Sequence, residues 1–130
     1  NIAEGSMASG ISKETEIKLV GVARASLEEL LLDYKDFLRV RKLKLFDKTD
    51  PIILKIREIG RQDDRTYASY ESYIENQSQE ISANTIICLI HQTNYLLDRQ
   101  LRKLEELFIK DGGIREKMFR ARQEERNKRR

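Results

Sequence analysis

Several residue types that carry structure or chemistry are scarce in this chain. It has one cysteine, one histidine, one proline and no tryptophan. The single cysteine, Cys88, excludes a disulfide within the chain and is typical of a reducing compartment, which predicts a cytoplasmic protein. The longest apolar runs, such as Leu30-Leu31-Leu32, are too short to span a bilayer, and no secretory signal is visible. We therefore expect no membrane partner.

The same scarcity removes most catalytic and metal chemistry. One histidine cannot supply the paired Glu-x-x-His motifs of di-iron bundles, and no Cys/His spacing fits structural zinc. The glycines form neither a phosphate-cradling loop nor a dinucleotide fingerprint. We therefore predict no metal, no cofactor, no catalytic residue and no enzymatic activity.

Charged side chains are abundant instead, at 36% of the 130 residues. This abundance suits amphipathic helices with solvated faces, and no strand-like alternation is visible, so we predict an all-α fold. The charge is unevenly distributed. Residues 112–130 hold eight Lys/Arg against three Glu, a net charge of +5, whereas residues 1–111 carry a net charge of −2. A cationic end of this kind attracts a polyanion or an acidic protein surface.

Apolar residues at alternating steps of three and four predict two long helices. The first is expected from about Lys13 to Lys42, after an N-cap at Ser12. Its apolar seam comprises Val20, Ala23, Leu27, Leu30, Tyr34 and Phe37, widened by Leu31 and Leu38. The second is expected from about Ser82 to Lys110, where Gly112-Gly113 ends it before a final basic helix or tail. Its seam comprises Ile87, Ile90, Asn94, Leu97, Leu101, Leu104 and Phe108.

Two shorter helices are expected between the long ones. Asp50 and Pro51 form a clear start signal, an N-cap followed by proline at the first helical position, and Gly60 is the expected end. Asp63-Asp64 is the expected cap of the other helix, which bears a tyrosine stripe of Tyr67, Tyr70 and Tyr73. The stripe could stack on nucleic-acid bases, but we favour the interpretation that it docks this helix onto a bundle.

A family resemblance covers roughly residues 1–60 and is carried by the first 38. The chain begins Asn1-Ile2-Ala3-Glu4-Gly5-Ser6, with a short linker to Gly10, and continues SKETEIKLVGVARASLEELLLDYKDFL. This stretch is similar to the four-helix bundle proteins first described as encoded in intervening sequences of large-subunit ribosomal RNA. There it closes the second helix and opens the third. The resemblance implies an antiparallel long-helix bundle whose N-terminal helices are missing from this chain, with Gly5 breaking the incoming helix.

The resemblance also implies three parts along the chain. Residues 1–61 would be the C-terminal half of the four-helix bundle, and residues 62–111 a helical suffix extension that some members carry. Residues 112–130 would be the basic tail or helix. A related bundle protein, the accessory protein of diversity-generating retroelements, forms a homopentamer and works with a reverse transcriptase and RNA. A homo-oligomer and an RNA partner are therefore implied for this chain.

Three smaller constellations have two interpretations each. Cys88 and His91, three apart on one helix, could form a thiolate–imidazole pair, but we favour a half-buried cysteine and a histidine beside the seam. Asn94 could set the register of a helix–helix contact or face a water-filled gap, and both interpretations stay open. An acidic stripe could bind a divalent cation, although three carboxylates on one helix give too few ligands. It comprises Glu29, Asp33 and Asp36.

Two basic clusters carry the only binding chemistry that the sequence supports in quantity, because phosphate contacts need little besides Lys and Arg. One comprises Arg39, Arg41, Lys42 and Lys44, and the other comprises Arg115, Lys117, Arg120, Arg122, Arg126, Lys128, Arg129 and Arg130. We predict a non-enzymatic helical assembly module that binds RNA or another nucleic acid through these residues. The alternative is a structural or protein-docking module without a nucleic-acid role.

Overall fold

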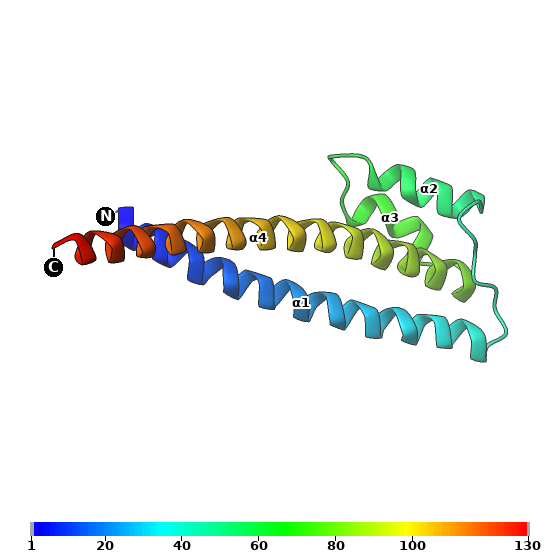
Figure 1. Ribbon diagram of the computed structural model, residues 1–130. Helices are drawn as coiled ribbons and strands as arrows, with labels where there is room; N and C mark the ends of the chain where they lie inside the picture. The colour runs from blue at the N-terminus through cyan, green and yellow to red at the C-terminus, as the bar shows by residue number, and fades with distance from the viewer. Residues whose placement is uncertain (1, 130) are drawn as a thin grey trace. The chain divides into compact units, whose positions relative to one another are not determined.

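The structure, a computed structural model, describes residues 2–129, and these residues form four helices and no strand (Figure 1). The helices are α1 (Ile2–Val40), α2 (Pro51–Gly60), α3 (Tyr67–Ile74) and α4 (Gln79–Arg129). The predicted all-α class is confirmed, while the bundle arrangement that the resemblance implies stays a prediction. None of the described helices is both long and apolar enough to cross a membrane.

Contacts group the chain into two compact units. Unit 1 contains residues 1–22 and 98–130, so it takes in the first part of α1 and the last part of α4. Unit 2 contains residues 23–97, with α2, α3 and the adjoining parts of the long helices. These units follow spatial contact, whereas the expected parts 1–61, 62–111 and 112–130 follow family resemblance, so that division stays a prediction.

The core of unit 2 is organised around the first five turns of α4. One apolar cluster joins α4 to α1 and has as its buried members Leu31, Leu38, Ala83, Ile87 and Ile90. A second cluster joins α4 to α2 and α3 and has as its buried members Ile53, Ile56, Ile59, Tyr70 and Cys88. Because fully burying one large aliphatic side chain contributes about 1.5–3 kcal/mol, these clusters account for the packing of all four helical segments in this unit.

The buried face of α1 is rotated from the predicted one. Leu31 and Leu38, expected only to widen the seam, are buried, whereas Leu30 is 41% exposed and Ala23 is exposed. Successive residues of a helix point about 100° apart, so a contact centred on Leu31 leaves Leu30 at its solvent edge. The predicted seam of α4 agrees better with the structure, because its members from Ile87 to Leu104 are buried or half-buried.

The end of α1 is a Schellman motif, in which a residue of left-handed conformation lets two backbone bonds close the last turn. Lys42 has a φ of 57° and donates its N–H to the Arg39 carbonyl (3.1 Å). Leu43 donates its N–H to the Leu38 carbonyl (2.9 Å) and packs against the cluster that contains Leu38. A lysine thus occupies a position where glycine is usual, at a cost of about 1–2 kcal/mol.

Two side chains of α4 form hydrogen bonds with the backbone of the connection between α1 and α2. Asn84, only 1% exposed, accepts a hydrogen bond from the Phe46 N–H (2.7 Å) and donates one to the Lys44 carbonyl (2.8 Å). One turn earlier, the Glu80 carboxylate accepts a hydrogen bond from the Lys44 N–H (2.6 Å). These bonds satisfy backbone groups that lie outside any helix and hold the connection against α4.

The start of α2 is as predicted. The Asp50 carboxylate accepts a hydrogen bond from the Ile52 N–H (2.9 Å), Pro51 is the first helical residue, and Gly60 is the last. Local sequence signals determine where α2 begins and ends, because the cap, the proline and the glycine each act within one turn.

The predicted starts of the other three helices are wrong. α1 is already helical at Ile2, so Ser12 is not its N-cap. At α3 the cap is Thr66, whose N–H donates to Ser69 Oγ (3.2 Å), rather than Asp63-Asp64. Ser69 in turn donates its N–H to the Thr66 carbonyl (3.0 Å). Thr66 and Ser69 therefore cap the helix, and the carboxylates of Asp63 and Asp64 do not. At α4 the Ser78 hydroxyl accepts a hydrogen bond from the Ile81 N–H (3.2 Å), and the helix begins three residues before the predicted Ser82.

In unit 1 the two long helices are joined by a polar contact and by apolar burial. Lys13 of α1 forms an ion pair with Asp111 of α4, and both side chains are partly buried. Val20 and Leu104 are each 8% exposed. The burial strengthens the ion pair relative to one in open solvent, because less water screens it.

The glycines predicted to interrupt the helices do not interrupt them. α1 continues through Gly5 and Gly10, so the expected linker at residues 6–10 is wrong, and α4 continues through Gly112 and Gly113. Among the described residues no glycine has a positive φ, which a glycine cap would need. Each internal glycine costs about 1 kcal/mol relative to alanine, and the strong helix formers that follow Gly113 offset that cost.

Candidate nucleic-acid interface

The predicted basic tail is the exposed last part of α4. Every residue from Gly112 to Arg129 is helical and exposed, whereas Arg130 lies outside the described residues. The sequence left open whether this segment is a helix or an irregular tail, and the structure shows a helix. Helical geometry therefore fixes which cations share a face.

The cations of this helix divide between two faces. At about 100° per residue, four arginines fall within an arc of about 60°, and we call them the arginine stripe: Arg115, Arg122, Arg126 and Arg129. The remaining cations lie on the opposite side of the helix: Lys117, Arg120 and Lys128. The arginine stripe extends over the 14 helical steps from Arg115 to Arg129, or about 21 Å at 1.5 Å per residue. A row of this length can contact several successive phosphates.

Acidic neighbours neutralise only part of this charge. Glu116 pairs with Arg120 (2.8 Å) and Glu125 pairs with Arg129 (2.9 Å), both at the i, i+4 spacing. Such exposed pairs contribute about 0.3–0.5 kcal/mol each, so a phosphate can displace the carboxylate at little cost. Arg122 and Arg126 form no ion pair with any residue that the structure describes. The middle of the arginine stripe is therefore open to an anion.

The other predicted basic cluster lies at the end of α1, in unit 2, and its side chains do not converge. Arg39 pairs with Asp36 (3.4 Å), and the Arg41 guanidinium lies 3.7 Å above the centre of the Phe37 ring. Lys42 closes the helix, and the backbone of Lys44 is bound by α4. All four side chains are exposed, yet each has a local structural setting of its own.

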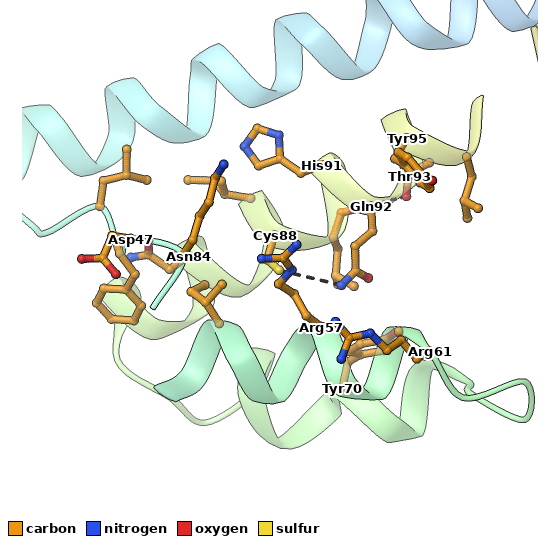
Figure 2. A pocket seen from close by; sticks show the side chains of 18 of the residues that line it. Asp47, Arg57, Arg61, Tyr70, Asn84, Cys88, His91, Gln92, Thr93 and Tyr95 are labelled. Atoms are coloured by element: carbon orange, nitrogen blue, oxygen red, sulfur yellow. Dashed lines mark hydrogen bonds between the residues drawn. The ribbon is translucent and has the colours of Figure 1, made fainter. Parts of the chain in front are cut away.

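Cys88 and His91 face different neighbours although they are close in sequence. Cys88 is buried against α2 and α3, and this burial raises the pKa of its thiol, an effect that nearby Arg57 partly offsets. His91 extends toward α1 (Figure 2), and loss of solvent followed by the charge of Lys35 lowers the pKa of its imidazole. No hydrogen bond joins the two side chains in the described residues, so the structure offers no support for a thiolate–imidazole pair.

The tyrosine stripe of α3 serves mainly to dock the helix. Tyr70 is buried in the second apolar cluster and Tyr73 packs against it, which agrees with the favoured interpretation. Tyr67 is 56% exposed, and its hydroxyl donates a hydrogen bond to Glu75 (2.8 Å). The carboxylate at this hydroxyl raises the pKa of Tyr67.

The acidic stripe of α1 and Asn94 of α4 differ in their surroundings. The acidic stripe of α1 is exposed, and no three His, Cys, Asp or Glu side chains among the described residues are grouped to hold a metal ion. Asn94 is buried at 5% exposure, and its Oδ1 has no hydrogen-bond partner among those residues. Burial inside the α4 seam agrees with a residue in a helix contact, while the choice between register and a gap that holds water stays open.

A groove that no pattern in the sequence indicated lies in unit 2 (Figure 2). Its cavity of about 970 Å³ is lined from α1, the connection to α2, α2 itself, the connection from α2 to α3, Tyr70 of α3 and residues 84–96 of α4. Its charged lining residues are Lys35, Asp47, Lys48, Arg57, Arg61 and Arg65. These cations are scattered over 31 positions of the sequence, so no local motif signals them, and only the packing of α1 and α2 beside α4 brings them to one groove.

Comparison with known proteins found no family model, no curated protein and no solved structure that matches this chain. The resemblance to the four-helix bundle family therefore stays a prediction.

Proposed function

We propose that this chain is a non-enzymatic helical module that binds RNA through the arginine stripe of α4. The observation that carries the proposal is the alignment of four exposed arginines on one face of a helix, two of them without an ion pair. Arginine suits this role because its planar guanidinium binds phosphate with two parallel hydrogen bonds. The choice of RNA over other nucleic acids, the homo-oligomeric state and a cytoplasmic location rest on the family resemblance and on the single cysteine.

The test is a titration of a fluorescein-labelled, single-stranded 20-nucleotide RNA, followed by anisotropy at several salt concentrations. Binding through three or four phosphate contacts gives a slope of log K against log salt of about −2 to −3. The triple variant Arg122→Gln, Arg126→Gln, Arg129→Gln is expected to bind at least tenfold more weakly and to lose about two units of that slope.

A matched control distinguishes a specific face from general positive charge. Lys117→Gln, Arg120→Gln, Lys128→Gln removes the same number of charges from the opposite face of the same helix. We expect this variant to keep most of its affinity. Equal losses in the two triple variants would show that net charge alone attracts RNA, and an absence of binding at low salt would refute the proposal.

A protein-docking role is the second candidate, and exposed apolar side chains beside the arginine stripe favour it. Ile114, Met118 and Phe119 are 49%, 52% and 63% exposed. Aromatic residues, methionine and arginine are enriched at protein interfaces. Binding of a protein partner through these side chains would depend weakly on salt, and Phe119→Ala would reduce it while leaving the salt slope of RNA binding unchanged.

A further inference from the structure

The groove of unit 2 has the size of a small-molecule site. Its volume of about 970 Å³ lies within the usual range for ligand pockets, about 300–1,000 Å³. Residues 84–96 of α4 form one wall, α2 contributes Ile53, Arg57 and Gly60, Arg61 follows the end of α2, and α1 contributes Lys35. The groove lies wholly within unit 2, whereas the arginine stripe belongs to unit 1.

The lining of the groove has an excess of positive charge that the protein does not neutralise. Among its charged residues only Asp47 is acidic, and hydrogen bonds from Thr49 lower the pKa of Asp47, which keeps it ionised. Glu58 of α2 forms an ion pair with Lys55 of the same helix, and neither residue lines the groove. None of the five lining cations forms an ion pair with a described residue: Lys35, Lys48, Arg57, Arg61 and Arg65.

Apolar side chains are exposed in the same groove. Leu45, Tyr95 and Leu96 line it and are 50%, 59% and 49% exposed. A ligand that covered them would gain free energy from the apolar surface removed from water. A fully hydrated inorganic anion would leave this surface exposed, so the lining favours a molecule with both an apolar body and a negative group.

The α2 side of the groove is held in place by close packing with α4. Figure 2 shows Arg57 directed from α2 toward Cys88 and Gln92 of α4. The Gln92 amide donates toward the Ile56 carbonyl (3.4 Å) and lies so close to Gly60 that an added Cβ would be 2.7 Å from its oxygen. The Gln92 amide of α4 thus lies against Ile56 and Gly60 of α2, on either side of Arg57 in the sequence.

From these observations we infer that the groove binds a small organic anion, an apolar or aromatic body that carries one phosphate, carboxylate or sulfonate group. The anionic group lies near Arg57 and Arg61, and the apolar body covers Tyr95 and Leu96. This site is independent of RNA binding by the arginine stripe, since the two use different residues in different units.

Two fluorescent probes of similar shape test the inference on the intact chain. 8-Anilino-1-naphthalenesulfonate carries the negative group, and N-phenyl-1-naphthylamine is its neutral counterpart. We expect the anionic probe to bind at least tenfold more tightly than the neutral one. Equal affinities would overturn the inference, because the cations would then contribute nothing.

Variants locate the two parts of the site. Arg57→Gln with Arg61→Gln should weaken binding of the anionic probe about tenfold and leave the neutral probe unchanged. Lys55→Gln, on α2 but outside the lining, is the matched control and should change neither affinity by more than about twofold. Leu96→Gln should weaken both probes.

Circular dichroism checks that each variant keeps its helix content, so a change in affinity reports the groove and not unfolding. An equal effect of Lys55→Gln and the arginine pair on the anionic probe would refute the site. RNA titration of the same arginine variant should give wild-type affinity, which separates failure of this inference from failure of the proposed function.

Discussion

Loss of the Asn84 side chain should strongly weaken unit 2. Its side chain binds the Phe46 N–H and the Lys44 carbonyl, so Asn84→Ala leaves two backbone groups in a partly buried setting without partners. Each unsatisfied group costs about 1–3 kcal/mol. The third bond of the amide, to the Glu80 carbonyl, leaves no orphan because that carbonyl is within reach of the helical bond from residue 84. Alanine returns about 0.5 kcal/mol of helix propensity, so we expect a net loss of about 2–5 kcal/mol.

Urea unfolding followed by tyrosine fluorescence measures this loss in the correct part of the chain. All five tyrosines lie between residues 34 and 95, and the chain has no tryptophan, so the signal reports unit 2 alone. With a slope near 1 kcal/mol per molar urea, the expected loss lowers the unfolding midpoint by about 2 M or more.

Thr85→Val is the matched control for Asn84→Ala. Thr85 is fully buried next to Asn84, but its hydroxyl bonds only the Ile81 carbonyl of its own helix (2.8 Å). Valine has a similar shape and creates no orphaned backbone group, so the expected cost is that of one hydrogen bond, about 0.5–1.5 kcal/mol. A cost of Asn84→Ala no greater than that of Thr85→Val would refute the importance of the bonds to the connection.

Three further predictions follow from backbone conformation and from charge. Lys42→Gly should raise the free energy of unfolding of unit 2 by about 1 kcal/mol in the same titration, because glycine adopts the left-handed conformation without strain; an unchanged midpoint would contradict this account. Gly112→Ala with Gly113→Ala should increase the far-ultraviolet helical signal, since an added Cβ meets nothing within 4 Å at either position; reduced helicity would contradict the continuous α4. His91 should titrate below its ordinary pKa of 6.5 in a proton NMR experiment, and Lys35→Gln should raise that pKa; a midpoint at or above 6.5 would contradict the partly desolvated placement beside Lys35.

The parts of the fold that depend on local chemistry could be predicted from the sequence. The Asp50-Pro51 start of α2 and the α4 seam are examples, because a cap acts within one turn and an apolar period repeats many times. The prediction that Gly112-Gly113 ends the helix was wrong, because two glycines destabilise a helix but do not end it when the residues that follow favour helix. The end of α1 at Lys42 lacked the usual glycine, so its left-handed residue was not foreseen.

The two candidate sites also differ in how much of each the sequence could predict. The basic residues of α4 were visible as a run of like charge, and the structure added that four of the arginines share one face. The groove depends on the approach of α2 to α4, which no spacing along the chain encodes. Asn84 likewise looked like an ordinary polar residue near the start of a helix.

The attachment of the connection to α4 also limits how this region can vary in length. Glu80 and Asn84 are one helical turn apart, a rise of about 6 Å, and they bind Lys44 and Phe46, which two residues of extended chain separate by about 6.6 Å. Because the spacings match, inserting or deleting one residue between Leu43 and Asp47 would point the bonding groups away from α4. Loops usually accept such changes. Length variation among relatives should therefore be found between α2 and α3, at residues 62–64, rather than between α1 and α2.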